Sequence, residues 1–184
     1  MTLYPSGTQI TLEPEQNAIV KLDDWTPDDT KAEIRVRGRR YGLLDITALC
    51  QHLDACLGTR VGEVIMRNHR TQLGKETVNR IRQSHPGISI HDIVKMLTEE
   101  DQFTGIGTTK LGLPENPLQA GNLTVWDPIV VSTAGAAKAF ISSYWAGVLS
   151  ELSKLDFEPA NIRYDEDEKL LTCRLSPKDT LSLK

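Results

Sequence analysis

Apolar residues recur every three or four positions in four separate stretches of the chain, which is the spacing of amphipathic helices. This spacing predicts helices over residues 45–58, 59–83, 89–101 and 133–155. Gly58 is a typical C-terminal stop for the first helix. Ser89, with Asp92 three residues on, resembles a capping box at the start of the third. The apolar residues of the second helix are Val61, Val64, Ile65, Leu73, Val78 and Ile81.

Strand-like alternation of apolar and polar residues follows the third and fourth helices. The first two such segments, "GIGTTKLGL" and "NLTVWDPIVV", are separated by a loop rich in proline and glycine and are expected to pair antiparallel. The last two, "FEPANIRY" and "KLLTCRL", flank the acidic turn "DEDE" as a closing hairpin. The order of elements predicts an α+β fold, an antiparallel sheet of about four strands with helices packed on one face.

The chain before the helices has a different composition. Residues 1–32 carry three prolines and the acidic run "DDWTPDD", and they are expected to form an irregular N-terminal arm, with one short strand at "NAIVKL". The segment "AEIRVRGRRYGLL" reads as a half-buried strand that turns at Gly38. We therefore expect a single domain over residues 33–176 and a C-terminal tail over residues 177–184.

Composition and charge exclude several classes of protein. With 184 residues, 39% hydrophobic and 25% charged, the chain has the composition of a globular domain. Its net charge of -4 gives no overall electrostatic reason to bind nucleic acid or an anionic membrane. The most apolar window, around residues 132–155, is broken by Lys138, several serines and Glu151, so no membrane span is expected. Three cysteines and no apolar leader at the start favour a cytoplasmic protein.

The fourth helix has one bulky side and one side of small residues, as the stretch "FISSYWAGVLSEL" shows. The bulky residues Ile141, Tyr144, Trp145, Val148, Leu149, Leu152 and Leu155 form the first side. Two interpretations stay open: the bulky side covers the sheet while the small side admits a neighbouring helix, or the small side leaves a cavity for an apolar ligand. The candidates for the ligand pocket are Tyr144, Trp145, Ala146, Gly147, Val148 and Trp126.

The second helix carries six basic side chains against two acidic ones. These charges could form a solvated face, balanced by acidic segments elsewhere such as the arm or "DEDE". They could also dock an acidic partner or an anionic ligand, because arginine forks suit carboxylates. The candidates for this docking site are Arg67, Arg70, Arg80 and Arg82.

Other chemistry-bearing residues give no catalytic or metal-binding pattern. The four histidines lack the spacing of a metal site, and no catalytic residue is predicted. Cys50 and Cys56 are expected to be buried small hydrophobes. The run "GIGTTKLG" begins like a phosphate loop, but no helix follows it, so its glycines are expected to serve bulges or close packing.

Several stretches resemble 4-vinyl reductase domains, which are related in fold to the small subunits of the TRAPP tethering complexes. They are "RYGLLDITAL", the glycine-bearing helix from Arg60, "NLTVWDPIVVS", and the run from "YWAGVLSEL" to "LLTCRL". The resemblance covers roughly residues 40 to 176. It implies an α/β plait of the TRAPP small-subunit type that dimerises through its helices, or pairs with a related subunit, and that often holds an apolar ligand.

The chain also departs from this family at sites of possible chemistry. Many members carry two cysteines in the last hairpin; here Cys173 matches the second, while Tyr164 and Asp165 stand where the first is expected. A lone thiolate leaves a tetrahedral metal without its ligands, so no metal site is expected there. The acylation cysteine of TRAPP subunits has no counterpart in the loop before the third helix.

Two functions follow as expectations. The first is a non-catalytic domain that binds an apolar small molecule, such as a lipid, a hydrocarbon or a tetrapyrrole, and is dimeric. The alternative is a protein-interaction or assembly factor that uses the plait as its docking surface; since the family occurs in photosynthetic bacteria, a pigment-protein complex is one concrete partner. An enzyme is the third choice, because no nucleophile-base pair is visible.

Overall fold

The computed structural model describes residues 25–28, 33–36, 39–41, 45–113, 119–130 and 134–178. Its helices are α1 (Ile46–Leu57), α2 (Thr59–Ser84), α3 (Ile90–Phe103) and α4 (Gly135–Ser153). Its main sheet contains β4 (Thr108–Gly112), β5 (Gly121–Trp126), β6 (Phe157–Asp165) and β7 (Leu170–Pro177). Three shorter strands, β1 (Trp25–Asp28), β2 (Glu33–Val36) and β3 (Arg39–Tyr41), form a separate antiparallel sheet. Of the predicted arm, only β1 lies in the described part, and the segment "NAIVKL" lies outside it.

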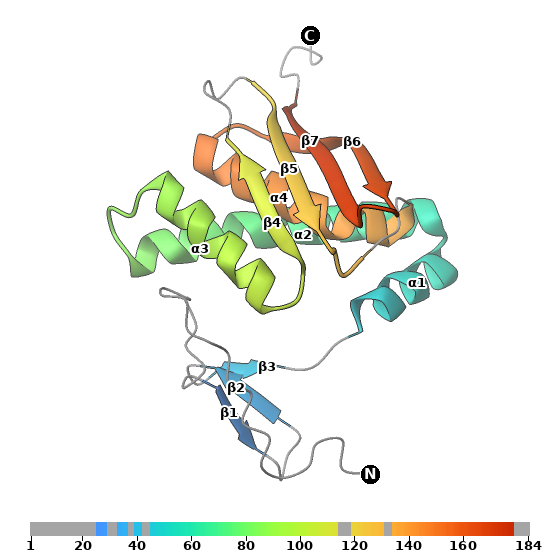
Figure 1. Ribbon diagram of the computed structural model, residues 1–184, viewed down its shortest axis with the longest axis horizontal. Coiled ribbons are helices and arrows are strands. Elements are labelled where there is room, and N and C mark those ends of the chain that lie inside the picture. Colours follow the sequence, from blue (N-terminus) through green and yellow to red (C-terminus); the bar gives the residue numbers. More distant parts are fainter. Residues whose placement is uncertain are drawn as a thin grey trace.

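The main sheet has the strand order β4-β5-β7-β6, and every neighbouring pair is antiparallel. The helices lie on one face of it, as Figure 1 shows. This arrangement confirms the predicted α+β plait, and the predicted order of the eight elements from the first helix to the last strand is also confirmed. No helix in the described part of the chain is long and apolar enough to cross a membrane.

Local signals fix the helix ends where the sequence predicts them. The Asp45 side chain accepts a hydrogen bond from the Ala48 N–H at 2.9 Å and caps α1, and the Ser89 side chain accepts one from the Asp92 N–H at 3.1 Å and caps α3. Gly58 ends α1 with a φ of 82°, a conformation that a side chain would disfavour. These short-range contacts explain why the predicted starts of α1 and α3 are correct.

Helix α4 is the centre of the molecule, since every residue from Ala139 to Ser150 is buried. One of its faces packs on the sheet, where Leu111, Leu123, Val125, Leu171, Cys173 and Leu175 point inward. Its opposite face packs on α2, which runs beside it. The core is therefore built from three layers, in the order sheet, α4, α2 (Figure 1).

Helices α2 and α4 approach each other so closely that glycine is required on both. A Cβ atom on Gly74 would lie 2.2 Å from the Tyr144 carbonyl oxygen, and one on Gly147 would lie 2.1 Å from the Thr71 carbonyl oxygen. The small side of α4 therefore admits a neighbouring helix, which confirms the first of the two interpretations of that side. Gly74 stands in the middle of α2 because the backbones meet there.

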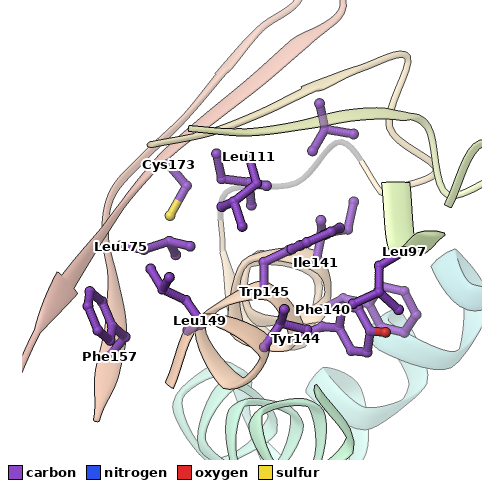
Figure 2. Packing of buried hydrophobic residues seen from close by; sticks show 14 of the residues in the cluster. Leu97, Leu111, Phe140, Ile141, Tyr144, Trp145, Leu149, Phe157, Cys173 and Leu175 are labelled. Atoms are coloured by element: carbon purple, nitrogen blue, oxygen red, sulfur yellow. The ribbon is translucent and has the colours of Figure 1, made fainter. Parts of the chain in front are cut away.

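The prediction that all the bulky residues of α4 share one side is wrong for Tyr144. Trp145, Ile141 and Leu149 lie between α4 and the sheet, whereas Tyr144 points towards the neighbouring helices (Figure 2). Arg70 of α2 lies over the Tyr144 ring, at 5.0 Å from the ring centroid. The prediction fails because α4 is buried all round, so its apolar periodicity does not separate a core face from a solvent face.

Candidate functional site

A buried carboxyl group lies where α3, β4 and α4 meet. Asp101, near the end of α3, is only 7% exposed. Its Oδ2 atom accepts a hydrogen bond from the Thr109 hydroxyl of β4 at 2.7 Å and a second from the indole N–H of Trp145 of α4 at 2.9 Å. Buried acidic side chains are rare unless they are paired, so this group is the most unusual polar feature of the core.

The turn after α3 brings Asp101 and Thr109 together. The Ile106 N–H donates to the Asp101 carbonyl at 2.9 Å and closes the turn. Gly105 and Gly107 on either side have φ values of 75° and 135°, which favour glycine. The first two glycines of "GIGTTKLG" therefore serve a tight turn that leads from α3 into β4. Close packing, as predicted, is confirmed at Gly107, because a Cβ atom there would lie 2.8 Å from the Trp126 carbonyl oxygen.

Burial in the core raises the pKa of Asp101 to about 6. The two hydrogen bonds from Thr109 and Trp145 oppose this rise, because both stabilise the ionised form, and the positive charge of Arg70 opposes it too. The neighbouring Glu100 carboxylate raises it further. Near neutral pH the folded protein thus holds a largely ionised carboxylate inside its core.

Beside this group, the Arg70 guanidinium is held between aromatic rings. Its carbon lies 4.0 Å from the centroid of the Phe140 ring, and its Nε–H donates to the Phe140 carbonyl at 2.9 Å. Burial is the main cause that lowers the pKa of Arg70 and raises that of the Tyr144 hydroxyl. Tyr144 and Trp145 meet edge to face, with ring centroids 5.9 Å apart. The carboxyl of Asp101 therefore lies at the Trp145 indole, which in turn meets the Tyr144 ring.

The predicted ligand-pocket residues are divided by the structure. Tyr144, Trp145, Ala146, Gly147 and Val148 are all buried in α4, and Trp126 at the end of β5 is 41% exposed. The structure brings Tyr144 and Trp145 to the buried carboxyl, whereas Gly147 lies against the backbone of α2. Trp126 lies apart from them, on the other side of its strand from the buried Val125.

All four predicted docking arginines make a contact within the protein. Arg70 and Arg82 donate to α4 carbonyls, those of Phe140 and Glu151, and Arg67 forms an ion pair with Glu63. Arg80 is exposed, and its guanidinium donates to the Thr77 hydroxyl at 3.1 Å.

The acidic partners of α2 that the structure describes come from α2 itself, from the last turn of α4 and from the segment between α4 and β6. Glu63 also pairs with Lys138 at 3.3 Å, and Lys75 pairs with Asp156 at 2.7 Å. Arg80 borders an open groove of about 340 Å³ on the outer side of α2, lined by Leu73, Glu76, Asn79, Arg80 and Gln83.

Sequence reasoning missed Asp101 and Thr109. One signal could have found Asp101, because it follows the buried Ile93 and Leu97 at intervals of four and so lies on the apolar face of α3. Its partner Trp145 is 44 residues away, and only the folded chain brings the two together.

Among the residues that the structure describes, no three or more His, Cys, Asp or Glu side chains are grouped so that they could hold a metal ion. Cys50 is buried as predicted, but the prediction is wrong for Cys56, which is exposed with its sulfur 3.5 Å from His52 Nε2. Cys56 lies near the C-terminal end of α1, where residues 55–58 are exposed.

Among known proteins, the likeness is one of structure alone. No family model matches the chain, and no curated protein matches it. The phenol-responsive sensory domain of the transcription activator PoxR, solved with phenol, has a similar structure with a TM-score of 0.60 and 15% identity, over 84% of this chain and 85% of that one. This likeness shows that the two chains share a fold.

Two H-NOX structures are more distant. A Cs H-NOX mutant has 17% identity and a TM-score of 0.40, over 79% of each chain. A mutant of T. tengcongensis H-NOX has 16% identity and the same TM-score, over 79% of this chain and 80% of that one. These likenesses are too weak to argue from.

Proposed function

We propose that this chain is a non-catalytic small-molecule-binding domain for an apolar ligand, formed by residues 33–176 with a 4-vinyl-reductase-like plait. The observation that carries the proposal is the buried Asp101 carboxyl among aromatic side chains. A few polar groups set in an apolar, aromatic interior are typical of ligand sites. The shared fold with a phenol-responsive sensory domain supports the same function.

The carboxyl group is costly to the folded protein, and this favours a functional role. An amide in the same place could accept the hydrogen bonds of Thr109 and Trp145 without carrying a charge. Ionisable groups whose pKa is strongly raised by burial gather at functional sites. We therefore place the ligand between α3, β4 and α4, with Asp101 as its polar contact.

The ligand is proposed to be small and apolar rather than a haem. A haem needs an axial ligand such as a buried histidine. His52, His69, His85 and His91 are all exposed. The described core therefore does not fit a haem held by histidine, and a small aromatic molecule, a hydrocarbon or a lipid chain suits its apolar side chains better.

Tryptophan fluorescence tests this proposal directly. The chain has three tryptophans, so replacing Trp25 and Trp126 by phenylalanine leaves Trp145, at the proposed site, as the only reporter. Phenol, toluene, decanoate and protoporphyrin are then titrated, and native mass spectrometry of the purified protein records any ligand carried from the cell. Saturable quenching by at least one small apolar probe is expected. A ligand-free protein that binds none of the four would overturn the proposal.

A protein-interaction role is the second candidate, favoured by an exposed apolar stripe. Leu57, Val61, Val64 and Ile65 are each 45–48% exposed along the end of α1 and the first turns of α2. Contiguous exposed apolar residues often mark a protein contact. The expected homodimer, related-subunit heteromer or assembly complex, including a pigment-protein complex, would use this stripe.

Light scattering after size exclusion tests the stripe. Val64→Glu places a charge at its centre and is expected to lower the mass of any assembly, while Gln51→Glu, on the exposed side of α1, is the control. A wild-type protein that is monomeric and captures no partner in a pull-down would count against this second function.

A further inference from the structure

The Asp101 carboxylate has acceptor capacity that its protein partners do not use. An ionised carboxylate offers about four acceptor positions on its two oxygens. Within the described residues, the hydrogen bonds from Thr109 and Trp145 both end on Oδ2. The carboxylate therefore has acceptor positions left for a further donor.

The two present donors differ in how easily they can be exchanged. The Trp145 N–H is fixed by a rigid indole ring that is 0% exposed in the middle of α4. The Thr109 hydroxyl is a rotor, which can turn away and donate elsewhere. Thr109 is the second residue of β4, close after the glycine turn. A ligand hydroxyl most readily takes the place of the Thr109 hydroxyl.

The charges around Asp101 disfavour an anion. Glu100, on the same helix, adds negative charge, and both it and Asp101 raise the pKa of Tyr144 of α4. On β4 the facing group is the neutral Thr109. Arg70 of α2 is the facing cation, but it donates to the Phe140 carbonyl, and no ion pair joins it to Asp101 in the described part of the chain. A second buried anion would meet a carboxylate that no ion pair neutralises.

Resting on the proposed function, we infer that Asp101 selects the ligand: the site takes a neutral aromatic hydrogen-bond donor, an aromatic alcohol or amine, whose O–H or N–H donates to the carboxylate in place of the Thr109 hydroxyl. The ring of such a ligand packs against the aromatic side chains of α4. Apolar molecules without a donor bind more weakly, and aromatic carboxylates are rejected.

The test compares four probes of similar size: phenol, aniline, toluene and benzoate. They are titrated at pH 7.5 into the full chain, with Trp145 as the only tryptophan. Phenol and aniline are expected to bind roughly tenfold or more tighter than toluene, because a hydrogen bond to a charged group is lost with toluene. Benzoate is expected not to bind.

Two variants move phenol binding in opposite directions. Asp101→Asn is expected to weaken it roughly 10- to 100-fold and to leave toluene binding unchanged. Thr109→Val removes the competing donor and is expected to tighten phenol binding. Asp156→Asn removes an exposed carboxylate that pairs with Lys75 far from the site, and serves as the matched control. Opposite shifts would show that Asp101 contacts the ligand. If the hydrogen bond between Asp101 and Thr109 only stabilises the fold, its loss should weaken binding in both variants.

The outcomes separate this inference from the proposed function. If no probe binds, the proposed function fails. If phenol and toluene bind equally and both variants leave them unchanged, the domain binds apolar molecules but Asp101 does not select them, and the inference is overturned. If Asp101→Asn does not fold, Thr109→Val decides: unchanged or weaker phenol binding overturns the inference.

Discussion

At the scale of single residues, the Asp101 carboxyl makes the stability of the fold depend on pH. Its pKa is 3.8 in a free side chain and about 6 in the folded protein. The folded protein therefore binds the proton more tightly, and the stability from this group is full below pH 3.8 and is lost as the pH rises through 6. The difference corresponds to about 3 kcal/mol.

Urea unfolding of the wild type and of Asp101→Asn between pH 4 and pH 8 measures this effect. The amide does not titrate, so the stability of the wild type relative to Asp101→Asn should fall by up to about 3 kcal/mol as the pH rises from 4 to 7. Groups that do not interact with Asp101 are common to both proteins and cancel. Two curves that stay parallel over this range would contradict the expected cost of the buried charge.

A second residue, Asp54 of α1, caps a helix that is distant in the sequence. Ala134, before the first turn of α4, has no side chain that can accept a hydrogen bond, and the Ala136 N–H donates instead to Asp54 Oδ1 at 2.9 Å. A Cβ atom on Gly135 would lie 1.8 Å from Asp54 Oδ2, and one on Gly62 2.2 Å from Oδ1. The two glycines make room for this carboxylate.

Asp54→Ala is expected to lower the free energy of unfolding by about 1–2 kcal/mol, because the N-terminus of α4 loses its acceptor. Asp54→Asn keeps an acceptor oxygen and is expected to cost less. Urea unfolding at neutral pH compares the two variants with the wild type. Equal losses in both would show that the charge, and not the hydrogen bond, stabilises the contact.

At the scale of elements, the packing of α2 on α4 depends on two glycines. The Cβ atom of Gly147→Ala would meet the Thr71 backbone, which cannot rotate away as a side chain could. We expect Gly74→Ala and Gly147→Ala each to cost about 1–3 kcal/mol, although alanine is the better helix former. Gly112→Ala in β4 is the control, because its Cβ would lie 3.5 Å from the nearest atom.

Thermal unfolding of the three alanine variants checks this expectation. A control that loses as much stability as the helix variants would mean that glycine is needed for backbone freedom rather than for close approach. A rise in stability at Gly74, as helix propensity alone predicts, would contradict the close contact.

At the scale of the whole molecule, local sequence signals predicted the helices and strands but could not predict the contacts between residues far apart in the sequence. The caps at Asp45 and Ser89 are satisfied within three residues, so the sequence contains them. The capping of α4 by Asp54 joins residues 82 apart, and the bond between Trp145 and Asp101 joins residues 44 apart. Such pairs form only when the plait closes, so the main polar group of the candidate site could not be predicted from residue spacing.

The reactivity of the three free thiols can show whether the core of the plait opens as one unit. Cys56 is exposed on α1, whereas Cys50 lies on the buried side of the same helix and Cys173 is a buried residue of β7. Burial raises the pKa of the Cys173 thiol to about 12 and also raises that of Cys50. Since the thiolate is the reactive form, both should be protected twice, by exclusion of the reagent and by protonation.

Pulsed alkylation followed by mass spectrometry is therefore expected to add one label to the native protein within minutes, on Cys56, and three labels after denaturation in urea. If the core opens as one unit, Cys50 and Cys173 gain their labels at the same rate, although one lies on α1 and the other on β7. If Cys50 is labelled well before Cys173, α1 opens while β7 is still protected. If Cys173 in the native protein is labelled as fast as Cys56, the expectation of a closed core is contradicted.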